Sequence, residues 1–232
     1  MRIDPALFLP PAAVAEMIAA ACRMRRPFAM IRIGDGEALT LAQGAVRSFA
    51  YVAGKGFLRE AGVIVPDPAA REKVAFAVRH ADLVGVASRR DLPDFAPLTE
   101  EVFTRLNLAP LRLCDCCINY ALQAEGLLVP LLRGRRLFLV NRRWEAWAGA
   151  LSRLYGLYVA GGAGVDHFGQ AEAVLAAAGR RRFEIALCAA GVPATWLAVR
   201  HARENRCVAL DLGRLADLTI ELAGKAASPG GN

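Results

Sequence analysis

Short apolar runs alternate along the chain with longer segments in which apolar residues recur at helical spacing. The apolar runs predict strands over residues 28–33, 82–87, 111–113, 137–140, 157–160, 183–189 and 207–210. The helical spacing predicts helices over residues 10–26, 37–43, 66–80, 98–105, 117–132, 144–155, 168–178 and 193–205. Between them, residues 44–64 are glycine-rich and predicted to be irregular.

This alternation is typical of βαβ units, in which a mainly parallel sheet is covered by helices on both faces. The length of 232 residues favours one large domain over two small ones. We therefore predict an α/β fold with a single doubly wound, Rossmann-like domain over residues 1–223 and a flexible tail over residues 224–232. In such folds, ligands bind beyond the carboxyl ends of the strands.

Composition excludes several classes of protein and one class of binding partner. With 55% hydrophobic and 22% charged residues, the chain is neither a disordered segment nor a coiled coil. The net charge of +7 raises the question of nucleic-acid binding, and all but three of the 29 basic residues are arginine. Arginines cluster at 23–26, at the end of the first predicted helix, and at 133–136 and 180–182, directly after two others, where cations complement the helix dipole. They form no single basic face with interleaved aromatic residues, so we expect no nucleic-acid partner.

The sequence favours a soluble cytoplasmic protein without a membrane span. Residues 18–22 faintly resemble a lipoprotein cleavage site, but Asp4 and Glu16 interrupt the apolar stretch that a signal peptide requires. The longest uncharged run, residues 185–199, is too short to cross a bilayer. Three of the six cysteines lie within residues 114–117, with no second Cys/His pair at zinc-finger spacing. They are predicted to be structural thiols in a reducing compartment.

Candidate chemistry concentrates in residues 31–37, where Gly34 and Gly36 bracket an acid at the end of a buried strand. Two nearby carboxylates, Asp35 and Glu37, repel each other unless a cation lies between them, and oxygen ligands in a turn suit Mg²⁺ or Mn²⁺. The alternative is that Asp35 caps a helix whose first turn contains Glu37. Arg32, within the strand, needs an anionic partner, either a ligand or one of these two acids.

The segment 28–43 resembles the opening motif of the GT-D fold glycosyltransferases, which carry Asp-X-Glu directly after their first strand. Residues 189–194 and 208–213 also resemble that family, and 117–122 do so faintly. The resemblance implies a GT-D type fold and transfer of a sugar from a nucleotide-diphosphate donor, expected to be a UDP-sugar. The acceptor would be an unidentified glycan, protein or small molecule. Asp35 and Glu37 then match the acids that bind Mn²⁺ or Mg²⁺, which neutralises the departing diphosphate.

Further donor contacts are predicted around this motif. Gly34 and Gly36 would allow the backbone to approach the donor closely. Free amides around Gly191, at a strand–loop–helix junction, would hold a phosphate, unless the segment is a plain tight turn. Asp211 would meet a sugar or ribose hydroxyl, or cap a turn. Two lesser candidates follow: Arg89 would face the diphosphate or lie in a solvated loop, and Asn119 would make a polar contact.

Two other readings remain open. The sequence Gly161–Gly164 could form a cofactor loop for NAD or S-adenosylmethionine, although the full Gly-X-Gly-X-X-Gly spacing is absent. The chain could also be a non-catalytic binding module that retains the GT-D fold. The oligomeric state is open at this point.

Overall fold

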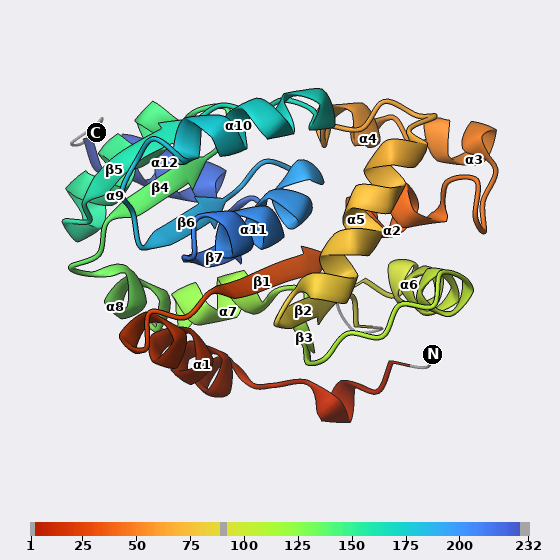
Figure 1. Cartoon of the computed structure of the whole chain (residues 1–232), viewed down its shortest axis with the longest axis horizontal. Helices are drawn as coiled ribbons and strands as arrows, with labels where there is room; N and C mark the ends of the chain where they lie inside the picture. Colours follow the sequence, from red (N-terminus) through yellow and green to blue (C-terminus); the bar gives the residue numbers. More distant parts are fainter. Residues whose placement is uncertain (1–2, 89–91, 228–232) are drawn as a thin grey trace, which may run out of the picture.

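Seven strands form one sheet in the order β3-β2-β1-β7-β6-β4-β5 in the computed structural model, which describes residues 3–88 and 92–227 (Figure 1). The strands are β1 (Phe28–Ile33), β2 (Leu83–Val86), β3 (Leu113–Asp115), β4 (Leu137–Val140), β5 (Val159–Ala163), β6 (Ile185–Cys188) and β7 (Val208–Asp211). Every pairing between these strands is parallel. The predicted α/β fold is confirmed, and the carboxyl ends of β1 and β7 lie side by side at the centre of the sheet.

Helices cover both faces of the sheet, and α5 and α11 lie in front of the strands in Figure 1. The helices of the described residues are η1 (Pro5–Leu7), α1 (Pro11–Arg23), α2 (Asp35–Ala42), α3 (Phe49–Ala53), α4 (Phe57–Glu60), α5 (Pro68–His80), α6 (Phe95–Arg105), α7 (Ile118–Ala124), α8 (Leu128–Leu132), α9 (Trp144–Tyr155), η2 (Phe168–Gln170), α10 (Ala171–Ala178), α11 (Pro193–Glu204) and α12 (Leu215–Ala227). Helices α2, α5, α6, α10 and α11 pack into one hydrophobic core. Helices α1, α7, α8, α9 and α12 pack into the other.

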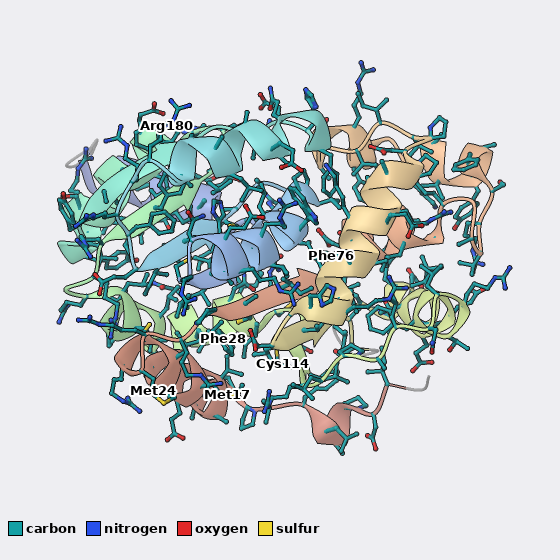
Figure 2. All side chains as sticks on the ribbon, in the orientation of Figure 1. Met17, Met24, Phe28, Phe76, Cys114 and Arg180 are labelled. Carbon is teal, nitrogen blue, oxygen red and sulfur yellow. The ribbon has the colours of Figure 1, made fainter. Side chains whose placement is uncertain are left out.

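Strand β1 separates these two cores. Ile31 and Ile33 point into the first core and Met30 into the second, because successive side chains of a strand face opposite sides of the sheet. Phe28 of β1 and Cys114 of β3 also belong to the second core (Figure 2). By the same alternation, Arg32 lies on the side of α7 and α12.

Local signals explain where several helices begin. Pro11, Pro68 and Pro193 each occupy the first turn of a helix, where the missing N–H is not needed. The Asp67 side chain accepts a hydrogen bond from the Ala70 N–H at 2.8 Å and so caps α5.

Several elements differ from the sequence prediction. The short helices α3 and α4 form within residues 44–64, which were predicted to be irregular. The helix predicted over 117–132 is two helices, because Gly126 adopts a φ of +70° between α7 and α8. Helix α12 was not predicted, and it includes residues 224–227 of the predicted tail.

The arginine clusters lie at helix ends, as predicted. Helix α1 ends at Arg23 and α10 ends at Ala178, just before Arg180, which lies on the outer side of the molecule (Figure 2). Within residues 3–88 and 92–227, none of the helices combines the length and the hydropathy needed to cross a membrane.

Candidate active site

Arg32 and Asp211 form an ion pair where the carboxyl ends of the central strands meet. Arg32 Nη2 lies 3.3 Å from Asp211 Oδ1, and Nη1 donates a hydrogen bond to the Cys116 carbonyl oxygen at 3.2 Å. The guanidinium therefore connects β1 to the end of β7 and to the turn that follows β3. The predicted need of Arg32 for an anionic partner is met by Asp211, which corrects the expectation that Asp35 or Glu37 would form this ion pair.

The pair is largely shielded from solvent: the side chains of Arg32 and Asp211 are 16% and 2% exposed. Burial disfavours the charged guanidinium, but the carboxylates of Asp211 and Glu37 outweigh it and raise the pKa of Arg32 above its ordinary value. Arg32 is thus a fixed positive charge. Its Nε atom is buried without a hydrogen-bond partner among the described residues, which leaves a donor for a bound anion.

Two glycines make room for this pair, and the sequence reasoning did not assign either of them to the site. At Gly213, φ is +51°, and a Cβ atom would lie 1.8 Å from Arg32 Nη2. The Gly213 N–H also donates to Asp211 Oδ1 at 2.9 Å. At Gly85, the partner of Arg32 across β1 and β2, a Cβ atom would lie 3.4 Å from Arg32 Cγ. The signal for Gly213 was a glycine placed two residues after an acid that ends a strand.

The two predicted acids lie together at the N-terminus of α2, whose N-cap is Gly34. Asp35 is the first helical residue and is exposed, and its Oδ1 accepts the Gly36 N–H at 2.8 Å. Glu37 reaches back so that its Oε2 accepts the Gly34 N–H at 3.0 Å. Both acids are therefore in the first turn, where the helix dipole favours negative charge. Asp35 is not itself the N-cap, which corrects that detail of the alternative reading.

Glu37 differs electrostatically from Asp35 because it is partly buried. Burial, together with the nearby Asp211 carboxylate, raises the pKa of Glu37 to about 7, and the Arg32 guanidinium offsets part of that increase. In the folded chain, Glu37 thus changes charge near neutral pH.

The raised pKa of Glu37 predicts a pH-dependent stability. Between pH 4.5, the ordinary pKa, and about pH 7, Glu37 keeps its proton in the folded chain but loses it in the unfolded chain. The unfolding free energy therefore falls as pH rises through this range. We expect metal-free Glu37→Gln to be about 1–2 kcal/mol more stable than wild type at pH 8, after allowance for solvent screening, and equal to it near pH 4. Urea unfolding with a chelator present measures this difference. Glu145→Gln, at an exposed acid in the first turn of α9, is the control; identical pH profiles for wild type and Glu37→Gln would refute the assignment.

The donor set at α2 fits a hard divalent ion that takes most of its ligands from elsewhere. Asp35 and Glu37 have no third acidic, His or Cys side chain close enough to complete a metal site among the described residues. The one group of three such ligands in that part of the chain is Asp115, Cys116 and Cys117. However, each carboxylate has a second oxygen outside the hydrogen bonds to Gly36 and Gly34. Mg²⁺ is usually held in this way, by one or two carboxylates together with water and substrate phosphates.

The other predicted contacts are distributed unevenly around this centre. Asn119 is fully buried and its Nδ2 donates to the Leu212 carbonyl at 2.7 Å, directly beside Asp211. Its Oδ1 has no partner in the described part of the chain. Arg89 lies outside the described residues.

The structure gives Gly36 and Gly191 packing roles. A Cβ atom on Gly36 would lie 3.1 Å from Val192 Cγ2, so this glycine faces the protein interior rather than the site entrance. Gly191 has a φ of +61° and abuts the backbone of Ala61, whose carbonyl accepts the Val192 N–H at 2.9 Å. One amide of the predicted phosphate loop is therefore already satisfied. The close packing nevertheless places this loop next to the N-terminus of α2.

The rival cofactor loop is part of a strand. Gly161 and Gly162 belong to the edge strand β5, which begins and ends later than the predicted 157–160. A Cβ atom on Gly162 would lie 2.5 Å from the Trp144 ring, so packing explains this glycine. The next element is the 3-10 helix η2, where His167 Nδ1 accepts the Gly169 N–H at 3.1 Å. This arrangement lacks the glycine turn leading into an α-helix that a dinucleotide loop requires.

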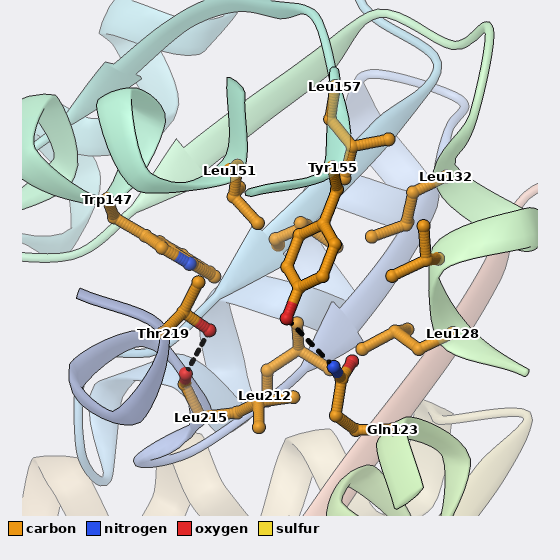
Figure 3. A pocket seen from close by; sticks show the side chains of 12 residues that line it. Gln123, Leu128, Leu132, Trp147, Leu151, Tyr155, Leu157, Leu212, Leu215 and Thr219 are labelled. Carbon is orange, nitrogen blue, oxygen red and sulfur yellow. Dashed lines mark hydrogen bonds between the residues drawn. The ribbon is translucent and has the colours of Figure 1, made fainter. Parts of the chain in front are cut away.

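An apolar cavity in the second core lies behind the site. The lining side chains leave a volume of only about 10 Å³, roughly the room of one water molecule, between α7, α8, α9 and α12 (Figure 3). Leu212, next to Asp211, lines it, and at its edge Gln123 Nε2 donates to the Tyr155 hydroxyl at 3.1 Å. None of the described lining residues is charged, so a diphosphate would not bind there.

Comparison with known proteins agrees with this architecture. The family model described as a GT-D fold-like domain matches residues 9–219. The chain belongs to the GT-D fold-like family. No curated protein matches the chain.

Solved structures place this GT-D fold-like chain next to glycosyltransferase folds. One is a domain of unknown function 1792 described as having a distinct glycosyltransferase fold; it is 14% identical with a TM-score of 0.65, over 94% of this chain and 82% of that one. A selenomethionine-substituted structure of domain of unknown function 1792 is 15% identical with a TM-score of 0.62, over the same shares. At such identities, the likeness establishes the GT-D fold alone.

Proposed function

We propose that the protein is a metal-dependent glycosyltransferase that moves a sugar from a nucleotide-diphosphate donor, a UDP-sugar, to a glycan, protein or small-molecule acceptor. The observation that carries the proposal is that a pair of acids and a buried ion pair lie together at the carboxyl ends of the central strands. Glu37 lies close enough to the buried Arg32–Asp211 ion pair to interact with both charges, and Asp35 lies in the same first turn of α2, in a chain of the GT-D fold-like family.

Charge and exposure suggest a different role for each residue in binding the donor. Asp35, which is exposed, and Glu37, which is partly buried, would hold Mn²⁺ or Mg²⁺. When bound, that ion neutralises negative charge on the departing diphosphate. Arg32 supplies a second, permanent positive charge, and its unpartnered Nε is available to a phosphate oxygen. Asn119, held by the Leu212 carbonyl, presents its Oδ1 to a donor hydroxyl.

The buried carboxylate of Asp211 has an orienting role in this proposal. It accepts hydrogen bonds from both Arg32 and the Gly213 N–H, which fixes the guanidinium in one position before the donor arrives. A preorganised charge needs little reorganisation when the leaving group develops negative charge. We place the protein in the cytoplasm, where nucleotide sugars are available and where its six cysteines, which form no disulfide, would stay reduced.

UDP release from a panel of UDP-sugars tests the proposal. We expect release with Mn²⁺, at least about a tenfold loss with a chelator, and recovery when Mn²⁺ is restored in excess, because the ion stabilises the leaving diphosphate. If no donor turns over and a partner protein co-purifies instead, the chain is a non-catalytic module. Thermal unfolding separates the cofactor alternative: stabilisation by NAD or S-adenosylmethionine, without stabilisation by UDP and Mn²⁺, would overturn the proposal.

A further inference from the structure

Three potential metal ligands converge at the turn that follows β3. A carboxylate oxygen of Asp115 and the Sγ atoms of Cys116 and Cys117 all lie within 4.8 Å of one another. The two sulfur atoms are 4.0 Å apart. Spacing along the sequence had predicted structural thiols here, because two separated Cys/His pairs are the usual zinc signature.

The backbone holds these groups in place. The Cys116 N–H donates to the Val86 carbonyl at 3.0 Å, which extends the pairing of β2 with β3 by one residue. The Cys117 N–H then donates to Asp115 Oδ1 at 2.7 Å, so the chain turns back and α7 begins at Ile118. Cys116 is buried and Cys117 is partly exposed, which gives an ion an approach from solvent.

The geometry suits a thiophilic ion of tetrahedral preference. With Zn–S bonds of about 2.3 Å, two sulfur ligands of a tetrahedral zinc ion lie about 3.8 Å apart, close to the separation observed here. Two thiolates and one carboxylate form a softer donor set than the all-oxygen ligands at α2, and soft donors favour Zn²⁺ over Mg²⁺ or Mn²⁺. Three protein ligands also leave a fourth position for water or another ligand.

We propose that Asp115, Cys116 and Cys117 bind one zinc ion, separate from the hard-metal site of Asp35 and Glu37. On binding, both thiols lose their protons to solvent and two Zn–S bonds form, with no oxidation or reduction. The site neighbours the candidate active site, because the Cys116 carbonyl accepts the hydrogen bond from Arg32 Nη1. The ion would thus fix the turn on which Arg32 rests. The zinc site does not rest on the proposed glycosyl transfer.

Cobalt titration of the reduced, metal-free protein tests this site, because Co²⁺ takes tetrahedral zinc sites and reports its ligands by absorption. We expect one equivalent of Co²⁺ to give a thiolate-to-cobalt charge-transfer band and tetrahedral visible bands, both abolished by Zn²⁺. Cys117→Ser should weaken cobalt affinity at least about tenfold and reduce the thiolate band. Asp115→Asn should weaken affinity while leaving that band in place.

Two matched variants separate the outcomes. Cys22→Ser, at a buried cysteine on α1, should leave the titration unchanged. Asp35→Ala should also keep the thiolate band, because cobalt bound at α2 would have oxygen ligands only. Absence of the thiolate band at saturating Co²⁺, or an unchanged band in Cys117→Ser, would overturn the proposal whether or not the protein transfers sugars.

Discussion

Replacing Arg32 with methionine is expected to lower the unfolding free energy by about 3–5 kcal/mol at pH 8. Methionine fills a similar volume but leaves Asp211, whose side chain is 2% exposed, as a buried charge without its cation. The substitution also removes the hydrogen bond from Nη1 to the Cys116 carbonyl. Urea unfolding of the metal-free protein measures the loss.

A second substitution tests the cause of that loss. Asp211→Asn in the Arg32→Met background should recover much of the stability, because the uncompensated charge is gone and Oδ1 still accepts the Gly213 N–H. The penalty of Arg32→Met should also shrink as pH falls through about 7, because Glu37 then gains a proton and no longer adds a second negative charge near Asp211. Arg180→Met, at an exposed arginine, is the control and should change stability little. A loss of unfolding free energy under 1 kcal/mol for Arg32→Met would mean that Arg32 does not stabilise the carboxyl ends of the central strands through Asp211.

Most of the fold follows from patterns that the sequence displays directly. Strand β6 is buried on both faces and so is a continuous apolar run, and β1 is interrupted only by Arg32. Prolines mark the starts of α1, α5 and α11. Helices α3 and α4 are too short to repeat a helical period, so residues 44–64 were predicted to be irregular. Strand β5 was predicted two or three residues too early, because glycines usually signal a turn. Here Gly162 lies within the strand, since the Trp144 ring leaves no room for a Cβ atom.

The candidate site was only partly predictable for a different reason. Asp35 and Glu37 are local in sequence, so their motif is visible without a structure. The pairing of Arg32 with Asp211 joins residues 179 positions apart, and it depends on β7 lying beside β1. The strand pattern does not specify that order. The role of Gly213 likewise becomes visible only once Arg32 lies against it.

Removal of the exposed acid should separate chemistry from folding. Asp35→Ala is expected to lower kcat/KM for the donor at least about 100-fold, because it removes a ligand of the ion that neutralises the leaving diphosphate. Its effect on stability should stay within about 1 kcal/mol, the size of a helix-dipole contribution from an exposed first-turn acid. Initial rates of UDP release across Mn²⁺ concentrations, together with urea unfolding, measure both quantities.

The matched control is Glu145→Ala, at an exposed first-turn acid of α9 that has no place in the proposed site. It should retain wild-type activity while losing a similar small helix-dipole contribution. Glu37→Gln should reduce activity and raise metal-free stability at pH 8, since Glu37 is the partly buried acid and Asp35 the exposed one. Equal turnover by wild type and Asp35→Ala would show that the first-turn acids do not hold the metal. If instead Asp35→Ala loses activity with little change in stability while Glu37→Gln gains metal-free stability at pH 8, the two acids have separate roles. Asp35 is then an exposed ligand for the metal, and Glu37 a partly buried acid whose charge interacts with Arg32 and Asp211.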